Sequence, residues 1–254
     1  MKNIKNYFFI LYIILLAFPG FNFAQDTIYV YGPGGPAPAM KDAADLFGKS
    51  TGIKVIVTAG PTPQWLNKAK HNADIIYSGS ENMMTDFVNA LDGKIVDSDV
   101  QPLYIRPLSL LVRPGNPKKI SGIKDILKTG VKILVVNGAG LTGAWEDMAG
   151  RKGDLKTVKL IRKNIVSYAK NSAEAKQQWI NNPEIDVWII WNIWQVSNPN
   201  LADVVSIEPD YAIYRPTDVV LTTLGKTKDT AKKFIEYLNS SDGEMIFKKW
   251  GWTR

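Results

Sequence analysis

Two glycine-rich turns, one in each half of the chain, most restrict what this sequence can fold into. Residues 31–36 (YGPGGP) and 137–143 (NGAGLTG) each follow a β-branched apolar run and precede a helix-like pattern. Backbone N–H groups at a helix start lack intrahelical partners and carry partial positive charge, and glycine lets a ligand oxygen approach the chain closely. The pair of turns therefore predicts two anion-binding loops, placed on either side of one ligand.

The first residues of the chain predict export. Lys2 and Lys5 precede an apolar run at 7–18, and a small-residue exit follows at Ala24, which is typical of a signal peptide. A membrane anchor is the alternative, but Pro19-Gly20 interrupts the run well short of the roughly 20 apolar residues that span a bilayer. We therefore expect residues 1–24 to be cleaved and the mature protein to be periplasmic.

Composition narrows the possible classes of function. The formal net charge is +7, and it falls to +5 when Lys2 and Lys5 leave with the signal peptide. A mildly basic chain modestly favours an anionic ligand, but no cluster of basic and aromatic residues predicts a nucleic-acid surface. The chain has no cysteine, which excludes disulfides, thiolate metal sites and a cysteine nucleophile.

Strand-like and helix-like segments alternate along the chain. Apolar β-branched runs predict strands, and apolar residues at helical spacing predict helices. The expected order is strand 27–31, helix 37–49, strand 53–58, helix 65–71, strand 74–77, helix 81–91, strand 103–112, helix 123–127, strand 132–136, helix 143–150, helix 172–181, strand 186–191, helix 229–239 and helix 243–250. Such alternation predicts an α/β fold with mostly parallel sheets.

Two matching segments, 104–108 (YIRPL) and 213–217 (IYRPT), place Arg-Pro inside extended runs. Proline is tolerated only at edges and irregular parts of a sheet, so the two segments fit paired crossover strands that leave and re-enter one lobe. Two unrelated edge strands are the alternative. The crossover interpretation predicts lobe 1 at residues 25–106 and 215–254 and lobe 2 at residues 107–214, with a ligand cleft between the lobes.

The runs YGPGGPAPAMKDAADLF, KVIVTAGPTPQWLNKAKHNADIIYSGSE and VNGAGLTGAWEDMAGR resemble accessory colonization factor C proteins. These proteins are type 2 periplasmic substrate-binding proteins, related to the molybdate- and sulfate-binding components of ABC transporters. The resemblance covers nearly the whole mature chain. It implies two Rossmann-like α/β lobes with discontinuous connectivity, a hinge of two crossover strands and closure around a small ligand.

The resemblance also implies which loops contact the ligand. The first loop falls on Gly34 and Gly35, where wider-family members often carry a serine that this chain lacks. In the second loop, Ser78-Gly79-Ser80, capping of the following helix is an equal alternative to ligand contact for Ser80. The third, fourth and fifth loops supply the remaining candidates, which are Gly140, Thr142, Gly143, Ser172 and Trp191.

Aromatic and cationic side chains add further candidates. Trp188, Trp191 and Trp194 have helical spacing, but the β-branched run 186–191 favours a strand with Trp188 and Trp191 on opposite faces. Trp191 at the strand end is then placed to wall the cleft, and the other two tryptophans are expected in the core. Arg106 and Arg215 either bind an anion or form an interlobe salt bridge, and the sequence leaves both roles open.

Two other classes of function find less support. The spacing of Gly138, Gly140 and Gly143 fits the dinucleotide fingerprint, but the basic stretch 155–162 supplies no strand-terminal acid. An exported hydrolase has no nucleophile elbow here and would have to use His71, the single histidine, which is expected at the surface. With one histidine and no cysteine, neither a metal site nor a cofactor is expected.

We therefore expect capture of a ligand without chemistry. Amides and hydroxyls from both lobes would replace the water around a small anion, and hinge closure would bury it. Sulfate or a similar tetrahedral oxyanion is the first hypothesis, because such donors can desolvate a fully ionised anion without a countercharge. A small organic acid or acidic amino acid is the alternative, for which an arginine contact is expected. An ABC permease or a chemoreceptor is the expected partner of a monomeric protein.

Overall fold

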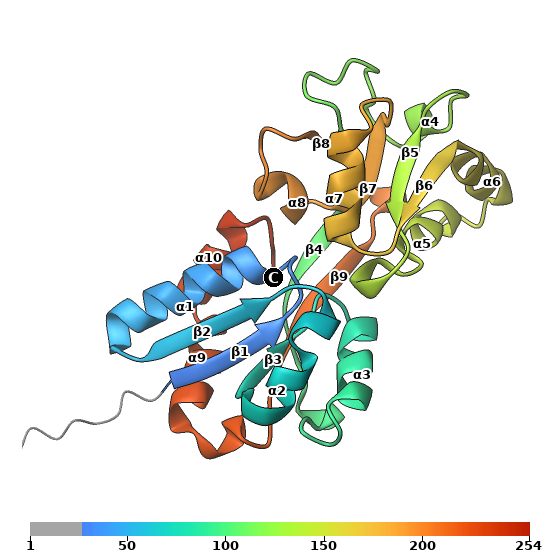
Figure 1. Cartoon of the computed structure of the whole chain (residues 1–254). Coiled ribbons are helices and arrows are strands. Elements are labelled where there is room, and N and C mark those ends of the chain that lie inside the picture. The colour runs from blue at the N-terminus through green and yellow to red at the C-terminus, as the bar shows by residue number, and fades with distance from the viewer. Residues whose placement is uncertain (1–26) are drawn as a thin grey trace, which may run out of the picture.

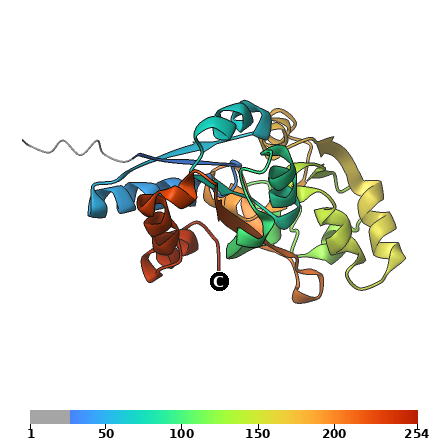
Figure 2. The ribbon, with the colours of Figure 1, turned by 90° about the horizontal axis from the view of Figure 1, so that it is seen from below.

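The computed structural model describes residues 27–254, and the predicted signal peptide at 1–24 lies outside them. Two groups of elements lie at opposite ends of the molecule, joined by the strands β4 and β9 (Figure 1, Figure 2). The strands are β1 Thr27–Gly32, β2 Lys54–Ala59, β3 Ile75–Tyr77, β4 Gln101–Val112, β5 Ile133–Val136, β6 Ile165–Ala169, β7 Val187–Trp191, β8 Asp203–Ser206 and β9 Tyr214–Leu221. The α-helices are α1 Ala37–Thr51, α2 Leu66–Asn72, α3 Glu81–Ala90, α4 Ile123–Ile126, α5 Ala144–Gly150, α6 Leu155–Asn164, α7 Ser172–Asn181, α8 Ile193–Val196, α9 Asp229–Leu238 and α10 Ser241–Lys249.

One mixed sheet passes through both groups, in the order β2-β1-β3-β9-β4-β7-β5-β6, and β8 pairs with β4. The first group (β1–β3, α1–α3, α9 and α10) contains parallel pairs of β1 with β2 and β3, and the second group (β5–β8, α4–α8) contains parallel pairs of β5 with β6 and β7. Every pairing of β4 and β9 is antiparallel. The expectation of mostly parallel sheets is therefore wrong, because β4 and β9 cross between the groups in opposite directions.

The two Arg-Pro segments are partners in this sheet, as the crossover interpretation predicted. Arg106 of β4 lies opposite Arg215 of β9, and Pro107 lies opposite Tyr214. From Leu108 onward, β4 pairs with β7 and β8 instead of β9. One long strand thus belongs to both groups, while the lobe boundaries drawn from the sequence stay a prediction.

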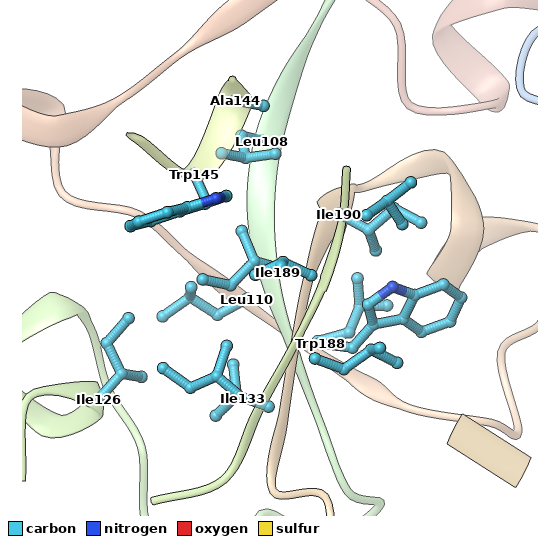
Figure 3. Close-up of a cluster of buried hydrophobic side chains, with 14 of the residues drawn as sticks. Leu108, Leu110, Ile126, Ile133, Ala144, Trp145, Trp188, Ile189 and Ile190 are labelled. Carbon is cyan, nitrogen blue, oxygen red and sulfur yellow. The ribbon is translucent and has the colours of Figure 1, made fainter. Parts of the chain in front are cut away.

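Buried apolar side chains form separate clusters on either side of this crossover. One cluster draws all its members from residues 108–213 and includes Leu110, Ile133 and Trp188 (Figure 3). The other two draw theirs from residues 28–104 and 219–252. The two ends of the described chain therefore share a core, in which Phe47 of α1 packs on Phe234 of α9 with ring centroids 5.2 Å apart.

The first glycine-rich turn is held by close packing on β3. A Cβ on Gly32 would lie 2.5 Å from the carbonyl oxygen of Tyr77, so this position requires glycine. The hydroxyl of Tyr77 donates to the carbonyl oxygen of Pro33 at 3.0 Å. These contacts fix the turn at the carboxyl end of β1, directly before α1 begins.

Residues 155–169 form a helix and a strand that the sequence analysis did not assign. The carboxylate of Asp154 caps α6 by accepting from the N–H groups of Lys156 and Thr157. β6 follows at once and pairs in parallel with β5. Lys170 comes after β6, so the acidic residue of a dinucleotide site is still missing from this position.

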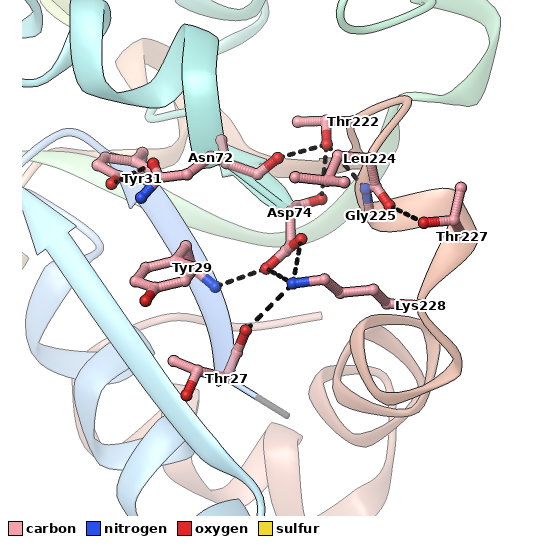
Figure 4. Close-up of polar contacts among 11 residues, drawn as sticks. Thr27, Tyr29, Tyr31, Asn72, Asp74, Thr222, Leu224, Gly225, Thr227 and Lys228 are labelled. Carbon is pink, nitrogen blue, oxygen red and sulfur yellow. Dashed lines mark hydrogen bonds and ion pairs between the residues drawn. The ribbon is translucent and has the colours of Figure 1, made fainter. Parts of the chain in front are cut away.

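A buried carboxylate fastens the first group together. Asp74, with no exposed surface, accepts from the N–H of Tyr29 at 2.8 Å and pairs with the ammonium group of Lys228 at 3.0 Å (Figure 4). Lys228 also donates to the carbonyl oxygen of Thr27.

Within residues 27–254, none of the helices combines the length and apolar character that crossing a membrane requires.

Candidate functional site

A cavity of about 150 Å³ lies where loops of the two groups meet. This volume is roughly ten times what one water molecule requires, which suits a small solute. The lining loops follow the carboxyl ends of parallel strands in both groups, the place where open α/β sheets bind ligands. The lining residues are Pro33, Gly34, Gly35, Pro36, Gly60, Pro61, Thr62, Gly79, Met83, Arg106, Gly140, Leu141, Asn171, Ser172, Ala173, Trp191 and Trp194.

Two helices begin at the wall of this cavity. Gly34 and Gly35 lie just before α1, and Asn171 and Ser172 lie at the start of α7. A Cβ on Gly34 or Gly35 would meet no atom within 4 Å, so the backbone is open to a ligand there. Helix starts present unpaired N–H groups and partial positive charge. Both groups therefore turn a positive helix end toward the same cavity.

Arg106 contributes a positive side chain to the cavity wall. It is 2% exposed, and its Nη2 donates to the carbonyl oxygen of Gly79 at 2.7 Å. Its guanidinium lies over the rings of Trp191 and Trp252, at 4.6 and 4.3 Å from the ring centroids. Its Nε has no hydrogen-bond partner among the described residues. A buried donor without a partner is uncommon and asks for an explanation such as a ligand.

The charge of a nearby carboxylate, Asp218, acts on this arginine. Burial lowers the pKa of Arg106 to about 9, while the charge of Asp218 opposes that shift. The guanidinium therefore stays protonated at neutral pH. Burial raises the pKa of Asp218 to about 6 against the hydrogen bond from Ser78, and nearby Glu81 adds to the rise. The hydroxyl of Ser78 donates to Asp218 Oδ2 at 2.5 Å.

Comparison with known proteins places this architecture in a family. The model of the bacterial extracellular solute-binding proteins matches residues 28–253. The chain belongs to this family. Its members bind solutes, which supports the expectation of a binding protein instead of an enzyme, and their extracellular description supports the predicted export.

Solved structures agree with the family match. PEB3 from Campylobacter jejuni is 38% identical, with a TM-score of 0.83 over 89% of this chain and 99% of that chain. PEB3 bound to L-phospholactate has a TM-score of 0.84 at the same identity and coverage. The periplasmic molybdate-binding protein of Azotobacter vinelandii, 18% identical with a TM-score of 0.66 over 89% of this chain and 99% of that chain, shares the fold. No curated protein sequence matches the chain. The predicted resemblance and the type 2 periplasmic binding protein fold are thus confirmed.

The cavity brings together many of the contact residues that were predicted from the sequence. They come from the turn before α1, the loop after β3, the crossover strand β4, the loops after β5 and β6, and the end of β7. They are Gly34, Gly35, Gly79, Arg106, Gly140, Ser172 and Trp191. Contact of these residues with a ligand stays a prediction.

The two serines of the second predicted loop are buried and do not line the cavity. Ser80 accepts from the N–H of Met83 at 3.3 Å and caps α3, which is the alternative that the sequence analysis left open. Ser78 is engaged with Asp218 and accepts from its N–H at 3.2 Å as well. Both hydroxyls therefore hold the loop that presents Gly79 to the cavity.

Three further candidates lie beside the cavity but outside its lining. Thr142 is exposed, and Gly143, with a φ of 72°, is the N-cap of α5. The guanidinium of Arg215 donates to the carbonyl oxygens of Gly140 at 3.4 Å and Thr142 at 3.1 Å, and pairs with Asp147 at 2.6 Å. Of the two roles left open for Arg215, the structure contains a salt bridge, which links the crossover strand β9 to α5.

Several lining residues escaped the sequence analysis. Gly60, Pro61 and Thr62 follow β2, the strand beside β1, and their place after a predicted parallel strand could have revealed them. Met83 was not predicted to line a site, because its position in the apolar pattern of the helix predicted a place in the core. Trp194 was expected in the core; it contacts Trp188 there with ring centroids 6.1 Å apart, but it also lines the cavity.

Histidine and acidic side chains are not among the described residues that line the cavity. His71 is exposed on α2, as predicted, and borders a separate surface hollow with Lys70 and Lys94. Across residues 27–254, no three acidic or histidine side chains gather so that they could hold a metal ion. The polar side chains among the lining residues are the guanidinium of Arg106, the amide of Asn171 and the hydroxyls of Thr62 and Ser172.

Proposed function

We propose that this protein captures a small organic anion that carries both a phosphoryl group and a carboxylate, and delivers it to an ABC permease or a chemoreceptor. One observation carries the proposal: the buried guanidinium of Arg106, with Nε unpartnered, lies on the wall of a cavity that two helix starts also border. L-phospholactate, bound in the structure of PEB3, has this chemistry.

Each part of the cavity suits a different part of such a ligand. Helix starts bind phosphate groups through backbone N–H donors, and these lie at Gly34, Gly35 and Ser172. A guanidinium binds a carboxylate through a fork of donors. The indole rings of Trp191 and Trp194 supply apolar surface for the carbon skeleton. Burial of this solute would come from hinge closure of residues 107–214 on residues 25–106 and 215–254, about β4 and β9.

Sulfate, the first hypothesis from the sequence, now has less support. Amides at helix starts suit any tetrahedral oxyanion, but a buried guanidinium and apolar walls favour an organic acid, for which an arginine contact was expected. The sulfate-binding protein SubI of Mycobacterium tuberculosis is 16% identical, and at this distance likeness supports the fold alone. Sulfate therefore serves as a comparison ligand in the test.

Calorimetric titration of the mature protein tests the proposal. The panel is L-phospholactate, phosphate, sulfate, molybdate and lactate. We expect L-phospholactate to bind at least tenfold more tightly than phosphate or lactate, because each of these lacks one anionic group. Arg106→Lys should weaken binding at least tenfold, since it keeps the charge but loses the fork, whereas the exposed Arg151→Lys is the matched control. Tighter binding of sulfate or molybdate than of L-phospholactate would overturn the proposal.

A further inference from the structure

Residues 251–254, the C-terminal segment, lie beside β4, and Trp252 among them contacts Arg106. Thr253 donates its N–H to the carbonyl oxygen of Ile105, and Ile105 donates to that of Thr253, both at 2.8 Å. Together they form an isolated antiparallel bridge. Ile105 directly precedes Arg106 in the chain. Residues 251–254 are therefore anchored one position away from Arg106, which lines the cavity.

Trp252 of this segment contacts Arg106 without lining the cavity. Its side chain is 2% exposed, and Cζ of Arg106 lies 4.3 Å from the ring centroid. Phe247 of α10 meets the same indole edge-on, with ring centroids 6.0 Å apart. A cation held over an aromatic face is attracted by the negative charge of that face, most strongly where water is excluded. Trp252 thus contacts the guanidinium of Arg106 from a position outside the cavity lining.

The same segment touches the second group of elements. The side-chain amide of Asn192 donates to the carbonyl oxygen of Gly251 at 2.7 Å. Gly251 has a φ of 81°, and a Cβ there would lie 2.7 Å from Nδ2 of Asn192. Only glycine satisfies both constraints. Asn192 follows Trp191, whose ring also contacts the guanidinium of Arg106. The C-terminal segment is therefore hydrogen-bonded to the neighbours of both Arg106 and Trp191.

We propose that Trp252 is a positioning residue for Arg106, and that the C-terminal segment thereby sets the affinity of the cavity for anions. The inference rests on the proposed function, because it takes Arg106 to be the group that meets the ligand. An arginine side chain has many rotamers, and holding it in one orientation before binding lowers the entropy lost on binding. Without the indole, the guanidinium has a gap on one face and loses that restraint.

Substitution at Trp252 tests this directly. Trp252→Leu should weaken L-phospholactate binding by about tenfold or more, whereas Trp252→Phe, which keeps an aromatic face, should restore most of the affinity. Trp179→Leu is the matched control, because Trp179 is equally buried and lies 3.7 Å from the guanidinium of Arg113, outside the cavity. That control should unfold more easily and bind like the wild type.

A second measurement does not depend on any ligand. The Nε–H resonance of Arg106 in the ligand-free protein, assigned by its loss in Arg106→Lys, should be sharp and shifted by the rings in the wild type. It should broaden and move toward the position of a free arginine in Trp252→Leu. If Trp252→Leu does not fold, Thr253→Pro, which removes the N–H that donates to Ile105, takes its place with the same expectations.

The outcomes separate the two proposals. A wild-type protein that binds none of the panel overturns the proposed ligand class, and the Nε–H resonance then decides the role of Trp252 by itself. A Trp252→Leu protein with wild-type affinity and an unchanged Nε–H resonance overturns the positioning role and leaves the proposed function standing.

Discussion

Gly140 is a residue at which the two groups touch. A Cβ there would lie 3.1 Å from the carbonyl oxygen of Gly79 and 3.2 Å from Oγ of Ser80, so both loops would have to move apart by a few tenths of an ångström. We expect Gly140→Ala to weaken ligand binding several-fold, while the free energy of unfolding changes by less than about 1 kcal/mol. Titration calorimetry and urea unfolding measure the two effects.

The control for this change is Gly150→Ala. Gly150 ends α5, and the nearest atom to its added Cβ would be 4.0 Å away. Alanine in a helix is favoured over glycine by about 0.5–1 kcal/mol, so this variant should gain stability and bind like the wild type. A Gly140→Ala protein with unchanged affinity would show that the two loops do not need to meet this closely.

Asp218 gives the protein a pH dependence of stability. Its pKa rises from 3.8 to about 6 on folding, chiefly by burial. Below about pH 4 the carboxyl is protonated in both states; between pH 4 and 6 the unfolded state loses its proton first, so stability falls as pH rises. The shift corresponds to about 3 kcal/mol at most. Asp218→Asn should lose this part of the slope, measured by urea unfolding from pH 4 to 7.5. The same dependence of unfolding free energy on pH in the wild type and Asp218→Asn would contradict this prediction.

Arg215 links the crossover strand β9 to α5 through Asp147 and to the loop before α5 through two carbonyl oxygens. Asp147 is 53% exposed, so Asp147→Ala should cost less than about 1 kcal/mol of stability and leave affinity nearly unchanged. Arg215→Ala also releases the carbonyl oxygens of Gly140 and Thr142. We therefore expect several-fold weaker binding from Arg215→Ala alone. Equal losses of affinity in the two variants would mean that the ion pair, not the backbone contact, holds the loop.

Elements that have a clear local hydrophobic or proline pattern could be predicted from the sequence. Features that depend on partners far along the chain could not. The apolar spacing of α1 and the proline pair at β4 and β9 led to the correct elements because each signal is local. The direction of pairing at the crossover depends on residues about a hundred positions apart, so the mixed sheet was missed. α6 was missed because basic residues are spread through 156–163 and make the amphipathic pattern around Ile161 less evident. β6 was missed because it is a short strand at the sheet edge with alternate side chains exposed.

The same distinction holds for the candidate site. A glycine-rich turn after a strand indicates a helix start from neighbouring residues alone. Gly34, Gly35 and Gly140 were predicted near the ligand on this basis, and they line the cavity. Side-chain roles at Ser78 and Arg215 depend on partners from other segments, Asp218 and Asp147. Trp252 gave no signal at all, because its contact with Arg106 arises only when the chain end returns to β4.

At the scale of the whole molecule, closure of the two predicted lobes should be visible in solution. Saturating L-phospholactate should reduce the radius of gyration measured by small-angle X-ray scattering. At 100 times the dissociation constant it should add about 2.7 kcal/mol to stability, a rise of several degrees in melting temperature. A melting shift with an unchanged radius of gyration would argue for a cavity that fills without hinge motion.

The route of the chain also decides the order in which an exported protein can assemble. Residues 108–213 close their own core from one continuous stretch. Phe47 and Ile75, by contrast, pack on or pair with Phe234 and Leu221, which come much later in the chain. Residues 108–213 can therefore fold first, whereas residues 28–104 can complete their core only with residues 219–252. On the predicted export route, we expect the cavity to be complete only after residues 219–252 have crossed, because they close the core of the first group.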